Sequence, residues 1–119
     1  MNTVNSVKMD ANELTDFLAG QSISIVCARN PDGKLVAHVT AFSSRADGIV
    51  LGIDEASKEL EDCTKACAIV DEYPDVKHIQ GAILRGEIKK VARGLHLEVR
   101  HQAGFDFGKL RRPTEEQGK

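Results

Sequence analysis

Residues 49–60 read Ile-Val-Leu-Gly-Ile-Asp-Glu-Ala-Ser-Lys-Glu-Leu, and this stretch is the most informative part of the sequence. Its first five residues form a nearly continuous apolar run, which predicts a strand buried on both faces. Residues 56–65 have a helix-forming composition, with Leu60 as the main apolar contact. We therefore expect a buried strand that runs directly into a helix at Ser57-Lys58.

The segment before this corner predicts one helix and two strands. Asp10 and Glu13 fit a capping box at the start of a helix over about 11–19, and Gly20 supplies a stop. In residues 22–29 polar and apolar side chains alternate and β-branched residues are frequent, as expected for a half-buried strand. The sequence Asn30-Pro31-Asp32-Gly33 predicts a tight turn, and residues 35–42 form the returning strand. A second turn signal at 47–48 then leads into the apolar run, so three antiparallel strands follow one another.

The segment after the corner predicts three more strands. Residues 66–70 are strand-like, 71–77 form a loop, and a long strand runs over 78–91. Gly81 and Gly86 lie within that strand, where glycine marks a bulge, a bend or a close approach of another backbone. One further strand is expected at 95–99, and from Lys109 onward the charged tail looks loosely ordered. The whole indicates a mainly β fold with a few short helices, a small antiparallel barrel formed by one domain over 1–119.

Composition narrows the classes of function. At 119 residues, 41% hydrophobic and 29% charged, the chain is an ordinary globular domain. No apolar run approaches the length of a membrane span, and residues 1–6 lack the features of a secretory signal, so we expect a cytoplasmic protein with no membrane contact. Three cysteines cannot form a closed disulfide framework within one chain, and Cys63 and Cys67 read as small apolar residues. We find no metal constellation and no catalytic nucleophile with a base at informative spacing.

Charge is distributed unevenly along the chain. Residues 1–53, 54–75 and 76–119 carry net charges of −1, −6 and +5. The basic final third suggests nucleic-acid binding. Proteins that bind single-stranded nucleic acid, however, rely on stacking aromatic side chains. With no Trp, one Tyr and four Phe, the sequence disfavours nucleic acid as a partner.

The order of elements resembles the pyridoxamine 5'-phosphate oxidase-like, FMN-binding split-barrel family, in a short form. Four stretches within about 11–92 carry this resemblance: 30–34, 39–42, 49–60 and 78–88. The resemblance implies an antiparallel split β-barrel that forms a homodimer with FMN in clefts at the interface. The matching cofactor-binding positions are the strand residues His38, Val39 and Thr40, the corner residues Gly52, Ile53, Asp54, Ser57 and Lys58, and Gln80. The implied function is flavin-dependent redox chemistry on a small molecule or a redox partner.

Elementary chemistry suits these positions to a flavin. A helix start with a hydroxyl and a lysine favours a phosphate, and an exposed strand backbone suits the polar edge of the ring. Each residue also has a plainer role: Ser57 as a helix cap, Lys58 as an ordinary surface lysine, and His38 as a core or interface residue. Five acidic residues between 54 and 62 oppose a phosphate. Two alternatives therefore stay open: a split barrel without flavin that serves as a binding or regulatory module, and a deazaflavin-dependent reductase.

Overall fold

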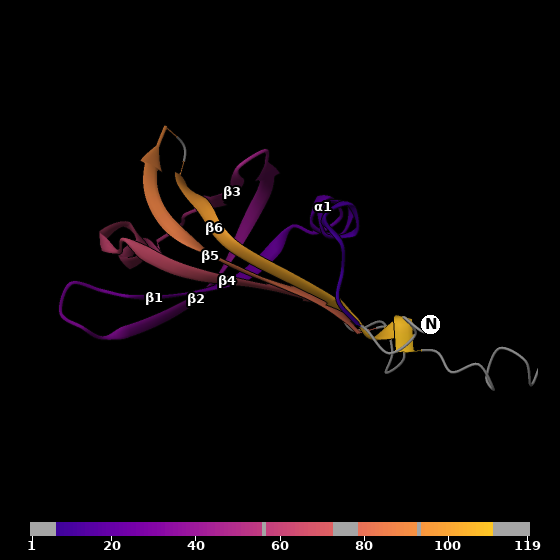
Figure 1. Ribbon diagram of the computed structural model, residues 1–119. Helices are drawn as coiled ribbons and strands as arrows, with labels where there is room; N and C mark the ends of the chain where they lie inside the picture. The colour runs from indigo at the N-terminus through magenta and orange to yellow at the C-terminus, as the bar shows by residue number, and fades with distance from the viewer. Residues whose placement is uncertain (1–6, 56, 73–78, 93, 111–119) are drawn as a thin grey trace, which may run out of the picture.

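A computed structural model describes residues 7–55, 57–72, 79–92 and 94–110, and Figure 1 shows their arrangement. Six antiparallel strands close into a barrel in the order β1-β2-β3-β6-β5-β4, so the predicted antiparallel barrel is confirmed. The strands are β1 (Ile23–Arg29), β2 (Leu35–Arg45), β3 (Gly48–Gly52), β4 (Lys65–Glu72), β5 (Gln80–Val91) and β6 (Gly94–Asp106). Among the described helices, α1 (Ala11–Ala19) is the α-helix, and η2 (Lys58–Asp62) and η4 (Phe107–Leu110) are 3-10 turns.

The helix α1 begins and ends where the sequence predicts. The Asp10 carboxylate accepts from the Glu13 N–H, and the Glu13 carboxylate accepts from the Asp10 N–H, each at 2.8 Å. Gly20 follows as the C-cap. The apolar face is buried and joins the barrel core, because Leu14, Phe17 and Leu18 are each less than a tenth exposed.

Two short ladders close the barrel. β1 pairs with β4 from Ile25↔Ile69 to Ala28↔Ala66, and β3 pairs with β6 over Gly48–Leu51. The β5–β6 ladder is far longer, and Figure 1 shows these two strands side by side along their length. Both closing ladders join strands that are distant in sequence, so local patterns alone do not predict them.

β2 changes its pairing along its length. It pairs with β1 over 35–41, but its ladder with β3 covers only 41–45, from Ala41↔Gly52 to Arg45↔Gly48. Within the described residues, the β3-facing edge of β2 over 35–40 therefore has no ladder partner. We call this open edge, together with the chain that leaves β3 over 52–58, the split.

The barrel interior contains the even-numbered residues of β1 and their partners. Val26 and Ala28 are buried, and so are Ser24 and Thr40, whose hydroxyl oxygens lie 3.3 Å apart. In β3, however, only Ile49 and Leu51 are buried, whereas Val50 is half-buried and Gly52 is exposed. The prediction of burial on both faces of this strand is wrong, because the barrel covers only its inner face.

Other element boundaries also differ from the prediction. The helix expected over 56–65 is the five-residue turn η2, which begins after Ser57 and buries Leu60 completely. β6 extends to Asp106, well beyond the strand expected at 95–99. Lys109, expected to begin a loose tail, belongs to η4. The loop residues 73–77, His78 and the tail from 111 lie outside the described residues.

The two glycines of the long strand β5 have separate structural reasons. At Gly81 an added Cβ would lie 2.4 Å from the Phe105 ring. At Gly86 it would lie 1.9 Å from the carbonyl oxygen of Glu98. The register also shifts here, since Arg85 pairs with His101 but Gly86 pairs with Val99, which leaves Arg100 as an extra, bulged residue.

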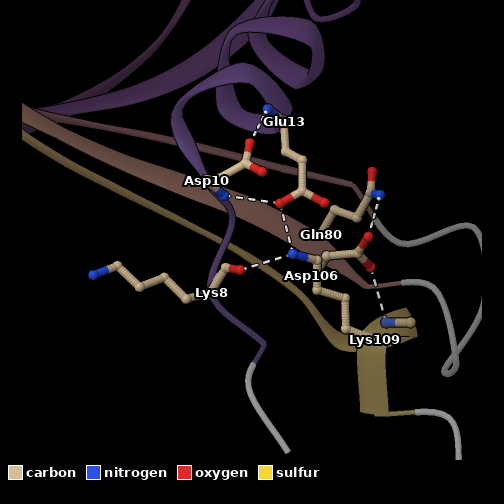
Figure 2. Close-up of polar contacts among 7 residues, drawn as sticks. Lys8, Asp10, Glu13, Gln80, Asp106 and Lys109 are labelled. Carbon is tan, nitrogen blue, oxygen red and sulfur yellow. Dashed lines mark hydrogen bonds and ion pairs between the residues drawn. The ribbon is translucent and has the colours of Figure 1, made fainter. Parts of the chain in front are cut away.

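Polar contacts join η4 to the start of α1 and the segment just before it (Figure 2). The Lys109 ammonium donates to the Glu13 carboxylate at 2.6 Å and to the Lys8 carbonyl at 2.9 Å. The Met9 N–H donates to the Gly104 carbonyl, so the segment before α1 continues along β6. In the part of the chain described, no helix has the length and apolar character needed to cross a membrane.

Candidate functional site

The split brings most of the predicted cofactor residues into one region. Gly52 pairs with Ala41, and the chain then leaves the sheet through Ile53 and Asp54 toward η2. A contact of 2.7 Å between the His38 imidazole and the Glu59 carboxylate joins β2 to η2. The unpaired edge of β2 and the start of η2 therefore lie next to each other.

Asp54 and Ser57 form a closed hydrogen-bonded loop at the start of η2. The Asp54 carboxylate accepts from the Ser57 N–H at 3.0 Å and from the Ser57 hydroxyl at 2.9 Å. The Ser57 hydroxyl oxygen accepts in turn from the Asp54 N–H at 3.1 Å. Ser57 is 1% exposed, so its hydroxyl holds the loop and does not point toward solvent. It makes no side-chain capping bond to η2 either.

The three predicted residues of β2 point to two faces. Thr40 is buried in the barrel with Ser24, and His38 shares its face, since His38 pairs with the buried Val26. Val39 points to the opposite face and is 65% exposed. A ligand in the split can therefore contact the Val39 side chain and the free backbone edge, while the Thr40 side chain is unavailable to it.

Charge at the split is mostly negative. Lys58 is exposed and is the one basic residue between 54 and 62, against the acidic residues Asp54, Glu55, Glu59, Glu61 and Asp62. Because η2 has only five residues, its dipole contributes less to anion binding than the helix expected from the sequence. Lys58 is therefore the principal group at this end of the split that could neutralise a phosphate.

Gln80 lies apart from the other predicted residues. Its amide donates to the Asp106 carboxylate at 3.1 Å, near η4 and the segment before α1 (Figure 2). β5 approaches the chain just after η2 at Ile88, whose N–H donates to the Thr64 carbonyl. At about 3.3 Å per residue, Gln80 lies roughly 25 Å along the strand from that point. One protomer alone does not bring Gln80 to η2.

A further feature, which the sequence analysis missed, is an apolar row on the outside of the barrel. Direct cross-strand partners place five outward side chains in line across five strands: Val39, Ile25, Ile69, Ile83 and Ala103. Ile25 is 41% and Ile83 39% exposed, and the neighbouring Ile23 is 55% exposed. The signal was present in β1, where the outward positions Ile23, Ile25 and Cys27 are as apolar as the inward ones. An exposed apolar patch of this kind marks an interaction surface.

The described residues contain no group of three or more His, Cys, Asp or Glu side chains that could hold a metal ion. Cys63 is buried after η2, and Cys67 points outward from β4, so the two do not share a helix face. All three cysteines are free thiols.

Comparison with known proteins gives matches in structure. No protein family model matches the sequence, and no curated protein matches it. A conserved hypothetical protein of Mycobacterium tuberculosis matches with a TM-score of 0.77 at 12% identity, over 95% of this chain and 94% of that one. A candidate pyridoxamine 5'-phosphate oxidase of Corynebacterium glutamicum matches with a TM-score of 0.73 at 16% identity, over 91% and 97%. An FAD-binding protein of Mycobacterium smegmatis matches with a TM-score of 0.70 at 15% identity, over 84% and 98%. At these identities the likeness establishes a shared fold.

Proposed function

We propose that this chain, which has the split-barrel fold of pyridoxamine 5'-phosphate oxidase-like proteins, binds a flavin between two copies of itself and acts as a flavin-dependent redox protein. The observation that carries the proposal is the open edge of β2, which lies next to η2 and near the apolar outer row. Flavin binding in proteins that share the fold supports it, since two such neighbours are described as FAD-binding.

The split matches a flavin in part. The free N–H and C=O groups of β2 suit the hydrogen-bonding edge of an isoalloxazine ring, and Val39 offers an apolar contact. The exposed Gly52 has no side chain to obstruct a ligand. Lys58 supplies one exposed cation, which favours FMN with its single phosphate. Ser57 does not fit as a phosphate donor, because its hydroxyl is buried and bound to Asp54; it positions the loop that carries Lys58.

A bound flavin would supply the electron-transfer chemistry, and the protein would supply position and electrostatic field. The apolar outer row would form the centre of a two-fold interface, in which the same patch of each copy meets its equivalent. Because Gln80 is remote from η2 within one protomer, it would contribute to a cleft from the second copy. Dimerisation and cofactor binding are thus linked in this proposal.

The test is titration of the purified chain with FMN, FAD and a deazaflavin in parallel, followed by absorbance and flavin fluorescence. We expect saturable binding of FMN and its loss in Lys58→Glu. Arg45→Glu is the matched control, since Arg45 pairs with Gly48 at the end of the β2–β3 ladder opposite Gly52 and the split. A wild-type protein that binds none of the three would refute the proposal. If the chain binds FAD or the deazaflavin more tightly than FMN, that molecule and not FMN is the cofactor.

The acidic surroundings of Lys58 and the occupied Ser57 hydroxyl favour one second candidate, a split-barrel module that binds a partner without flavin. In that case neither the wild type nor Lys58→Glu gains flavin absorbance in the titration. The oligomeric state of the variant also stays that of the wild type. The same titration therefore separates the two candidates.

A further inference from the structure

Cys27 and Cys67 face each other across two neighbouring strands. They are direct partners in the antiparallel ladder of β1 and β4, and both are half-buried on the outer face of the barrel. Opposed residues in such a ladder have Cα atoms about 4.5 or 5.5 Å apart, and disulfides span Cα separations of about 4.4–6.8 Å. The backbone therefore already has the spacing that a disulfide needs.

Cys27 and Cys67 both line an open groove of about 520 Å³. Apolar residues also line the groove, among them Leu35 and Ala66. The lining carries one acidic residue, Glu87, against the cations Arg29, Lys65, Arg85 and Arg100, with His101 beside them. Arg100 is paired with Glu87 at 3.5 Å and with Glu98 at 3.2 Å, so part of this positive charge is neutralised. We call this feature the cationic groove.

The bulge in β6 produces part of this charge. Arg100, the extra residue of the bulge, and the next residue His101 are both exposed, and both line the groove. Arg85 pairs directly with both Cys67 and His101, so one cation lies immediately beside the thiol pair. A groove of this kind attracts small molecules that carry carboxylates.

From these contacts we propose that Cys27 and Cys67 form a reversible dithiol–disulfide pair, oxidised by small anionic disulfides of the glutathione disulfide class. The thiolate of one cysteine attacks a sulfur of the reagent, forms a mixed disulfide and releases one reagent thiolate. The thiolate of the other cysteine then attacks the cysteine sulfur of the mixed disulfide. The Cys27–Cys67 bond forms, the bond to the reagent sulfur breaks, and the second reagent thiolate leaves. The protein loses two electrons and two protons, and the reagent takes them up as two thiols.

The structural effect of oxidation follows from the position of the pair. The β1–β4 ladder is one of the two short ladders that close the barrel, so the disulfide would join strands whose closing contacts are few. Burial and the neighbouring Cys27 raise the pKa of the Cys67 thiol, and Arg85 lowers it in part. The exchange is therefore expected to accelerate as pH rises toward the thiol pKa. This inference does not rest on flavin binding. Cys27 and Cys67 lie two residues from Ile25 and Ile69 of the apolar outer row, so the exchange requires the groove to stay open beside that row when two copies associate.

The experiment incubates the reduced full-length protein with glutathione disulfide, blocks free thiols with an alkylating agent and analyses the product by mass spectrometry. We expect a loss of two hydrogen atoms and a Cys27–Cys67 linked peptide, with Cys63 alkylated only after denaturation. The Cys63→Ser variant should react like the wild type, and Cys27→Ser should stop at the mixed disulfide. A wild-type product that carries glutathione without an internal link, or a link that involves Cys63, would overturn the proposal.

A second arm tests the cationic groove with cystamine, a disulfide that carries two positive charges in place of carboxylates. We expect glutathione disulfide to react several-fold faster at low ionic strength, and the difference to shrink as salt is added. The double variant Arg85→Gln with Arg100→Gln should reduce the preference while keeping both thiols. Equal rates for the two reagents with the wild type would overturn the assignment of an anionic oxidant.

Discussion

Replacement of Val39 by glutamate tests the apolar outer row as a dimer interface. Val39 is 65% exposed in the single chain, and full burial of an apolar side chain of this size contributes roughly 1.5–2 kcal/mol. Burying the exposed part would contribute about 1–1.3 kcal/mol per copy, and a two-fold interface contains the residue twice. The loss is then about 2–3 kcal/mol, which corresponds to a dissociation constant roughly 30- to 100-fold higher, since each 1.4 kcal/mol is about tenfold.

The unpaired glutamate charges add to this loss, so the estimate is a lower bound. Sedimentation velocity over a dilution series of the flavin-free protein measures the change directly. Val91→Glu is the matched control, because Val91 is 44% exposed at the β5–β6 turn, away from the apolar outer row. If Val39→Glu associates as tightly as the wild type, or if Val91→Glu weakens association equally, the row is not the interface.

Two further predictions concern stability. Leu60→Ala should lower the free energy of unfolding by about 2–5 kcal/mol, because Leu60 is fully buried in the turn η2. Urea denaturation measures this free energy, and a loss below about 1 kcal/mol would show that η2 packs loosely. The Lys109 hydrogen bond, helped by the Asp10 N–H, lowers the pKa of Glu13 from its usual 4.5. Ionised Glu13 therefore stabilises the folded state above its unfolded pKa, and this contribution disappears as pH falls through the lowered value. In thermal unfolding at a series of acidic pH values, Glu13→Gln should lose stability less steeply than the wild type on acidification; parallel curves would contradict this.

The elements predicted well from sequence are those with a strong local pattern. The capping box predicts both ends of α1, because Asp10, Glu13 and Gly20 act within a single helix. The two hairpins follow from turn residues and alternation. For Gly81 and Gly86 the sequence predicts a bulge, a bend or a close approach without separating the two positions, and the structure has the Phe105 ring against Gly81 and a bulge opposite Gly86. The closing ladders β1–β4 and β3–β6 depend on contacts between distant segments, for which the chain carries no local pattern.

The candidate site was predicted less completely, for two physical reasons. Alternation along β2 sends Thr40 inward and Val39 outward, so consecutive residues of a motif do not share a ligand. The sequence also suggests a free hydroxyl at Ser57, whereas a carboxylate three residues earlier binds it. The sequence also does not predict that Cys27 and Cys67 face each other. Their pairing depends on the β1–β4 register, which forms only when the barrel closes.

The bulge at Arg100 affects how this chain aligns with proteins that share its fold. Deleting Arg100 would leave the pairs Arg85↔His101 and Gly86↔Val99 adjacent in an uninterrupted ladder. A deletion elsewhere in β6 that shifts the register of its C-terminal half would turn those side chains to the opposite face of the sheet. It would thereby displace Gly104, at which an added Cβ would lie 2.8 Å from the Met9 sulfur. Where pairwise identities are as low as 12%, an alignment should therefore accept a one-residue gap at position 100 and resist gaps elsewhere in the strand.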